Sequence, residues 1–141
     1  MDKLKNNKKG FSLIEIMAAF SIVSLVFIGL MQAFPYGLSI NKTAQNTTVA
    51  SFLAQGEIES IRSLGYTNIP LGTVAKHRMS ADTTDYRYNF QAETVVTYVD
   101  SNLNNSGTDQ GLKKISVTLY FTNSISKNES SYNITTLISQ L

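Results

Sequence analysis

One acidic side chain stands alone in a long apolar stretch near the start of this sequence. Between Phe11 and Ile40 the only charged residue is Glu15. A carboxylate inside an apolar helix costs on the order of 2–3 kcal/mol on insertion-based scales, so it is retained where it has a role. A nearby amine would give it a partner, and a buried ion pair can fix the register of packed helices. The alternative is that Glu15 lies shallow enough to reach the membrane surface.

Other kinds of site chemistry are excluded or weakly supported. The sequence has no cysteine, which excludes disulfides, thiolate metal sites and thiol nucleophiles. His77 is the only histidine, which excludes a histidine metal cluster and paired acid–base histidines. Neither a nucleophile elbow nor a phosphate-binding glycine loop is present, although folding could still assemble a pair of carboxylates. We expect no enzymatic activity, no cofactor and no metal.

A polar segment at 100–109 has oxygen-bearing side chains at alternating positions, as a calcium loop does. However, an EF-hand loop has its glycine sixth and a glutamate twelfth, and here Gly107 comes eighth with no matching glutamate. A polar hairpin connection explains the same residues without an ion. We therefore predict a hairpin here.

Lys76 and Arg78 form a small basic patch with His77, near Tyr86 and Tyr88. Cations beside aromatic rings can bind single-stranded DNA, so these two residues are a weak candidate DNA contact. Three basic residues in a loop are usually solvated surface, and the tyrosines suit a core. Residues 11–141 hold 8 basic and 9 acidic side chains, so nucleic acid is not the expected partner.

The start of the chain combines a basic segment with an apolar one. Four lysines precede the run Phe11–Phe34, which at about 24 residues is long enough to span a bilayer. The lysines predict that the first residues stay in the cytoplasm. A secretory signal needs a small-residue cleavage site after the apolar run, and none is convincing here. A plain signal anchor would also explain this much.

Residues 12–64 are predicted to form one long helix, because apolar side chains recur at helical spacing well beyond the membrane-length run. Gly65 follows as a C-terminal cap. Gly29 and Pro35 are the expected places for a kink or local melting. The stripe in the second half consists of Val49, Ala50, Phe52, Leu53, Ala54, Ile58, Ile61 and Leu64.

The rest of the chain changes to a period of two. Residues 66–85 are expected to form a connecting loop. Apolar and polar residues then alternate in three segments, which predicts an antiparallel sheet with one wet face. The second half of the helix is the only cover for the apolar face, giving an α+β head. The alternating positions are Tyr86 to Tyr98, Ile115 to Phe121 and, more weakly, Tyr132 to Ile138.

The segment Lys8-Lys9-Gly10-Phe11-Ser-Leu-Ile-Glu15 resembles the leader and start of the type IV prepilin and type II secretion pseudopilin superfamily. The resemblance implies that a prepilin peptidase cuts after Gly10 and methylates Phe11. It also implies that Lys8 and Lys9 are leader charges and that Glu15 is the assembly residue. In this family the carboxylate docks on the amine that the cut creates.

The resemblance also implies the organisation of the chain. Residues 1–10 would be a removed cytoplasmic leader, 11–40 the transmembrane and assembly half of the helix, and 41–141 a soluble pilin-like head. The protein would reside in the bacterial inner (cytoplasmic) membrane with its head outside the cytoplasm, and then in a pilus or pseudopilus. Its partners would be prepilin peptidase, other pilin or pseudopilin subunits, and the membrane protein of the assembly platform.

Two looser motifs resemble one branch of this superfamily, the PilV-like minor pilins and the I-type minor pseudopilins. They lie at 50–62 and 107–118. They imply a minor structural subunit of a type IV pilus, acting in filament priming or at the tip. A minor pseudopilin of a type II secretion system and an adhesive or DNA-uptake tip subunit remain alternatives.

Overall fold

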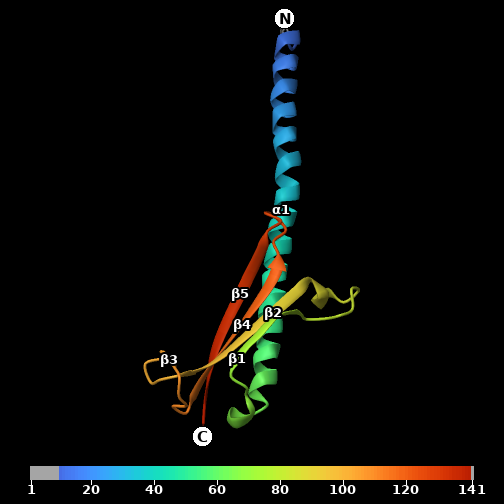
Figure 1. Cartoon of the computed structure of the whole chain (residues 1–141). Coiled ribbons are helices and arrows are strands. Elements are labelled where there is room, and N and C mark those ends of the chain that lie inside the picture. The colour runs from blue at the N-terminus through green and yellow to red at the C-terminus, as the bar shows by residue number, and fades with distance from the viewer. Residues whose placement is uncertain (1–9, 141) are drawn as a thin grey trace, which may run out of the picture. The chain divides into compact units, whose positions relative to one another are not determined.

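A computed structural model describes residues 10–140 of the chain, and the leader lysines Lys8 and Lys9 lie outside the described residues. The chain divides into two compact units, one ending at Leu38 and the other beginning at Ser39. Its first element, α1 (Leu13–Arg62), contributes residues to both units. The predicted long helix is therefore confirmed to within two residues at each end (Figure 1).

Within the first unit, α1 is apolar on every side. Its most apolar 18-residue window has a mean hydropathy of 2.4 and no buried residue. By length and composition this helix could cross a membrane. The local melting expected at Gly29 and Pro35 does not occur, since both residues lie inside α1.

Two serines in this apolar part satisfy their hydroxyl groups within the helix itself. Ser21 Oγ donates to the carbonyl of Met17 at 2.9 Å, and Ser24 Oγ donates to that of Phe20 at 2.8 Å. A hydroxyl bonded to the carbonyl four residues earlier is a common arrangement for helical serine. Neither side chain therefore depends on water.

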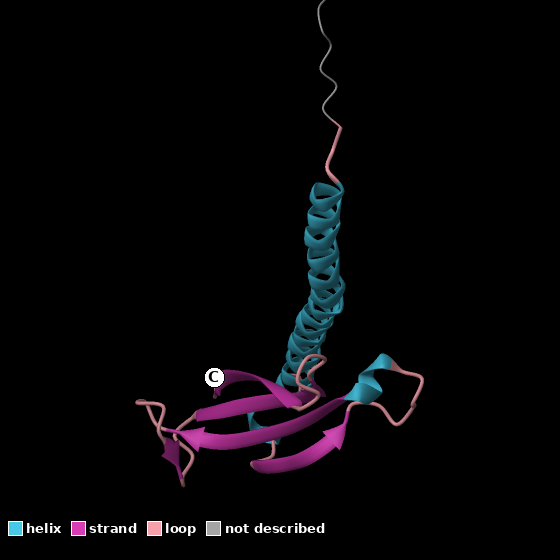
Figure 2. Ribbon diagram, turned by 90° about the horizontal axis from the view of Figure 1, so that it is seen from above, coloured by secondary structure: helices cyan, strands magenta, loops and turns pink. Residues whose placement is uncertain are grey.

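The second unit contains an antiparallel sheet in the order β1-β2-β4-β5, with β3 beside β2. All pairings are antiparallel (Figure 2). This unit confirms the α+β pilin-like class. The strands are β1 (Gly72–Arg78), β2 (Phe90–Val99), β3 (Asn105–Ser106), β4 (Leu112–Thr122) and β5 (Glu129–Ser139).

The helical part that begins at Ser39 covers one face of this sheet. Ala50 and Ala54 are fully buried, and their small side chains allow close packing against the strands. Phe52 was expected on the same stripe, but 67% of it is exposed. Because each helical residue turns about 100°, Phe52 lies about 200° from Ala50 and faces away from the sheet. The helix ends before Gly65, whose φ of 74° strains any other residue.

The alternating segments in β4 and β5 were predicted correctly. Every second residue of β4 from Lys113 to Phe121 is buried, whereas the core-facing residues of β5 are only half-buried. The core cluster consists of Ala50, Ala54, Ile58, Ile69, Phe90, Ala92, Val96, Ile115, Val117, Leu119 and Phe121.

Two predictions for the middle of the chain were wrong. The segment 66–85 is not only a loop, because it contains a short 3-10 helix, Tyr66–Asn68, and the strand β1. Tyr86 and Tyr88 do not extend β2 but lie in a second 3-10 helix, Tyr86–Asn89. The carboxylate of Asp85 accepts a hydrogen bond from the backbone N–H of Arg87 and begins this turn.

Candidate assembly site

The predicted cleavage position lies just before α1. Gly10, Phe11 and Ser12 are exposed and have no helical conformation. The carbonyl of Ser12 accepts the first helical hydrogen bonds, from the N–H groups of Glu15 at 3.0 Å and Ile16 at 3.2 Å. The peptide bond between Gly10 and Phe11 is therefore outside the helical ladder, as a protease requires.

Glu15 lies in the first turn of α1, where the unpaired N–H groups of a helix favour a negative charge. Together with Phe11, it lines an open apolar hollow of about 540 Å³. The structure thus brings two of the predicted site residues to one place. Sequence reasoning missed the other lining residues, although their helical spacing to Glu15 was a usable signal. They are Ile16, Ala19, Phe20 and Val23.

Within residues 10–140 the ion pairs are Arg62–Glu59, Lys76–Glu129 and Arg87–Asp85, so Glu15 has no ion-pair partner there. A carboxylate in an apolar hollow remains available to a cation from elsewhere. This is the arrangement expected if the partner arises on cleavage or comes from another chain.

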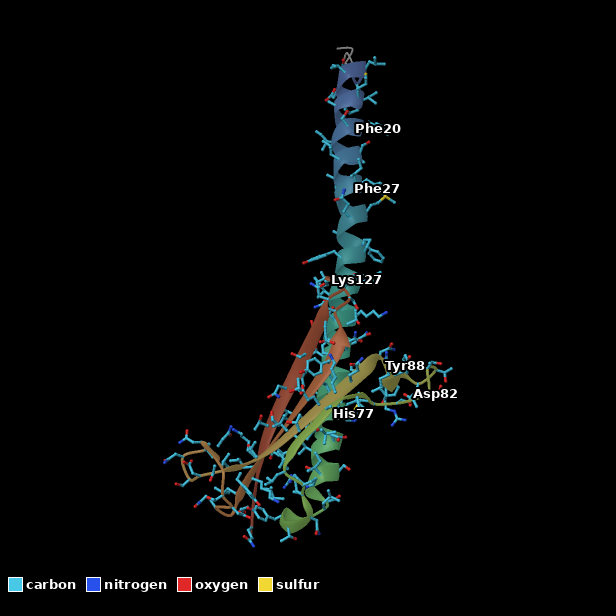
Figure 3. The ribbon with its side chains drawn as sticks, in the orientation of Figure 1. Phe20, Phe27, His77, Asp82, Tyr88 and Lys127 are labelled. Atoms are coloured by element: carbon cyan, nitrogen blue, oxygen red, sulfur yellow. The ribbon has the colours of Figure 1, made fainter. Side chains whose placement is uncertain are left out.

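A row of large apolar side chains runs along the same part of α1. Leu13, Phe20, Phe27 and Phe34 recur every seven residues, and they are 78%, 73%, 60% and 72% exposed. Figure 3 shows Phe20 and Phe27 extending outward from the helix. A seven-residue repeat keeps such side chains near one face, so they offer a seam to a neighbouring helix.

A family model described as the prokaryotic N-terminal methylation motif matches residues 5–31. This match supports the superfamily of type IV prepilins and pseudopilins. The match covers the residues around the predicted cut, Glu15 and most of the apolar run. Such prepilins are processed by prepilin peptidase, are anchored in a membrane by the apolar helix, and assemble with other pilins as structural subunits. No curated protein and no solved structure matches the chain.

The two candidate DNA contacts of this chain lie in β1, and each has a partner. Lys76 pairs with the carboxylate of Glu129, and its Nζ lies 3.9 Å from the centre of the Tyr120 ring. Arg78 lies 4.1 Å from the centre of the Tyr88 ring and donates to the Tyr88 carbonyl at 2.9 Å. Both cations therefore have partners within the head, Lys76 in the sheet and Arg78 in the 3-10 helix Tyr86–Asn89.

The segment at 100–109 is the hairpin connection that was predicted. The carboxylate of Asp100 accepts hydrogen bonds from the N–H groups of Asn102 and Asn104, both at 2.9 Å. These bonds lower the pKa of Asp100. Within the part of the chain that the structure describes, no three His, Cys, Asp or Glu side chains gather as a metal site would need.

Proposed function

We propose that this chain is a minor structural subunit of a type IV pilus, acting in filament priming or at the tip. The cut follows Gly10, Phe11 becomes the N-methylated N-terminus, and Glu15 guides docking. The observation that carries the proposal is the apolar hollow shared by Glu15 and Phe11. An amine created on Phe11, in this chain or in a neighbour, would meet the carboxylate beside apolar side chains, and packing against a neighbouring helix would strengthen their attraction by excluding water.

The minor role rests on the two motifs in the head. The first lies on the part of α1 that covers the sheet, and the second leads from the hairpin into β4. Their likeness to PilV-like minor pilins favours a subunit present in few copies. The same motifs suit a minor pseudopilin of a type II secretion system.

The proposed place of action is the inner membrane, with the leader in the cytoplasm and the head outside, before the chain enters the filament. The assembly-platform membrane protein and the other pilins would then be its partners. The distribution of charge supports this orientation, because the lysines of the leader precede the apolar run.

The first test is the mature N-terminus. We expect mass spectrometry of the chain co-expressed with a prepilin peptidase to show a terminus at N-methylated Phe11. Gly10→Val should abolish the cut, because the peptidase of this family cuts after glycine, and Gly29→Val, far from the cut, is the matched control. An intact Met1 terminus or a cut beyond Phe34 would refute the proposed processing. Immunogold labelling of long surface filaments would then separate a pilus from a short pseudopilus.

A further inference from the structure

The outer edge of β5 has no strand beside it. β5 is the last strand in the order β1-β2-β4-β5. Its 11 residues pair with β4 one for one from Glu129 to Ser139, without a bulge. Its other edge therefore presents a regular row of backbone N–H and C=O groups, which is a template for another strand.

The two edges of the sheet differ in how they are protected. Proteins block unwanted strand pairing with lysines, bulges and prolines. β1 has a bulge between Val74 and His77 and carries Lys76 and Arg78. β5 has no charged residue after Glu129, and it contains no proline or glycine. One edge is closed to pairing and the other is open.

Core side chains on β5, the strand with the open edge, remain partly exposed. In β4, Val117 and Leu119 are fully buried, whereas their partners in β5, Ile134 and Tyr132, are only partly buried. Removing apolar surface from water is stabilising. An added strand would gain this stabilisation as well as its backbone hydrogen bonds.

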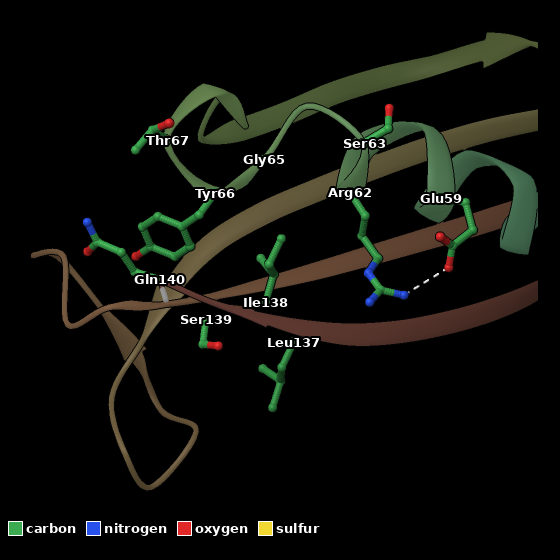
Figure 4. Close-up of a pocket in the computed structure, with 10 residues that line it drawn as sticks. All are labelled: Glu59, Arg62, Ser63, Gly65, Tyr66, Thr67, Leu137, Ile138, Ser139 and Gln140. Atoms are coloured by element: carbon green, nitrogen blue, oxygen red, sulfur yellow. Dashed lines mark hydrogen bonds and ion pairs between the residues drawn. The ribbon is translucent and has the colours of Figure 1, made fainter.

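A groove lies alongside the C-terminal end of β5, between this strand and the end of α1 (Figure 4). Its volume is about 740 Å³. It can receive a side chain from a strand that begins here. The groove is lined by Glu59, Arg62, Ser63, Gly65, Tyr66, Thr67, Leu137, Ile138, Ser139 and Gln140.

A second copy of the chain does not suit this edge. In antiparallel pairing, the β5 strand of a second copy has no basic residue to place beside Glu129. Parallel pairing would bring Glu129 next to its own copy. Pairing with β1 of another copy is blocked by its bulge and lysine.

The charge of Glu129 indicates the direction and the chemistry of a strand that would pair with the outer edge of β5. Because the sheet is wholly antiparallel, an added antiparallel strand would place its C-terminal end beside Glu129. The Glu129 side chain is 56% exposed, and its Oε1 pairs with Lys76. Among the described residues no ion pair uses its Oε2, which is left for a cation of the incoming strand. A basic residue near the end of the incoming strand would therefore be favoured.

We propose that the outer edge of β5 accepts an extended segment of a neighbouring subunit with a different sequence, as an antiparallel strand with a basic residue near its C-terminal end. The proposal rests on the chain being a filament subunit. The added strand lengthens the sheet, covers Tyr132 and Ile134, and enters the groove beside Leu137. Recognition is by main-chain hydrogen bonds, with specificity from alternate side chains.

The test uses the full chain in cells that assemble its filament. A photo-reactive benzoyl-phenylalanine replaces Thr135 in β5 or, as the matched control, Thr73 in β1, both of which are exposed. We expect the probe at 135 to crosslink to one extended segment of another subunit, and the probe at 73 to give none. A crosslink to a second copy of this chain, or none at either position, would overturn the proposal.

A lysine at the open edge should prevent pairing. We expect Thr135→Lys to lower incorporation of the chain several-fold and Thr73→Lys to leave it unchanged, with equal thermal unfolding of both variants. Hydrogen exchange should show that the outward-pointing β5 amides, those not bonded to β4, are protected in the assembled chain and not in detergent micelles. An assembled, correctly cut chain whose outward-pointing β5 amides stay unprotected would refute this inference alone, whereas an uncut chain would refute the proposed function.

Discussion

The ammonium group of Lys113 donates a hydrogen bond of 2.8 Å to the carbonyl of Ile69 and another of 2.7 Å to that of Tyr66. Lys113 is only 3% exposed, and it points into the core from β4. Its Nζ also lies 4.6 Å from the centre of the Tyr66 ring. A buried charge thus ties the segment after α1 to the middle of the sheet.

Replacing this lysine should therefore loosen the head. We expect Lys113→Met to lower the free energy of unfolding by about 1–3 kcal/mol, since two buried carbonyls lose their donor. Urea unfolding of the full chain in detergent micelles measures the change. Lys114→Met is the control, because Lys114 bonds Asn105 at the surface. Equal or greater stability of Lys113→Met would mean that dehydrating the ammonium group costs more than its bonds return.

Tyr66 should make the head sensitive to alkaline pH. Burial and the hydrogen bond from its hydroxyl to Asp109 raise the pKa of Tyr66 to about 12. Because the folded state holds this proton more tightly than the unfolded state, the contribution to stability is complete below about pH 10 and is lost as the pH rises towards 12. Unfolding measured at pH 9 and 11 should show the fall, and Tyr66→Phe should reduce it. The same pH dependence in Tyr66→Phe and Tyr88→Phe would contradict this assignment.

Removing the Glu15 carboxylate should leave the cut after Gly10 intact but impair assembly into filaments. We expect Glu15→Val to be cut after Gly10 as in the natural chain but to enter filaments at a much lower level, because the new amine has no partner. Mass spectrometry of the N-terminus and blotting of sheared filaments measure the two steps. Ser24→Ala, in the same helix, should assemble normally. Normal assembly of Glu15→Val would leave Glu15 as a surface-reaching carboxylate only.

The contact between α1 and the sheet should not tolerate a larger side chain. Ala54 is fully buried there. We expect Ala54→Leu to destabilise the head by about 1–3 kcal/mol through overpacking. Gln55→Leu, at an exposed neighbouring position, is the control for hydrophobicity. Thermal unfolding of both variants gives the comparison, and equal melting temperatures would show that the packing adjusts.

The basic residues of β1 should contribute little to nucleic-acid binding. Lys76 is neutralised by Glu129, and Arg78 lies against Tyr88. We expect weak DNA retention by the full chain at low salt, unchanged in Lys76→Ala with Arg78→Ala. Glu129→Gln should increase retention by releasing Lys76. Strong, salt-dependent retention that the double substitution removes would instead support a DNA-receiving tip subunit.

The strands with strict alternation could be predicted from the sequence, and β1 could not. β4 and β5 each present one apolar face, which is the pattern that a half-buried strand requires. All seven residues of β1 are exposed, so burial imposed no alternation on them. Tyr86 and Tyr88 continue the period of β2, but the Asp85 cap, a local hydrogen bond, turns that segment into a 3-10 helix.

The candidate assembly site at Glu15 could be predicted only in part. Glu15 stands out because its charge is alone in an apolar run. The hollow around it needed the helical arrangement of several apolar residues that carry no individual signal. The burial of Lys113 could not be predicted from the sequence either, although Lys113 has the same two-residue spacing as the buried Ile115 and Val117 in β4. A lysine at such a position ordinarily indicates the wet face.

Ser21 and Ser24 keep their hydroxyl hydrogen bonds within their own helix, which matters when a pilin subunit moves from the membrane into a filament. The apolar helix first faces lipid and later faces the helices of other subunits. A free hydroxyl would need a new partner at each stage, and losing one would add a barrier to leaving the bilayer. Since both serines keep their acceptors on the same helix, the subunit can change surroundings without exchanging a single bond at these positions.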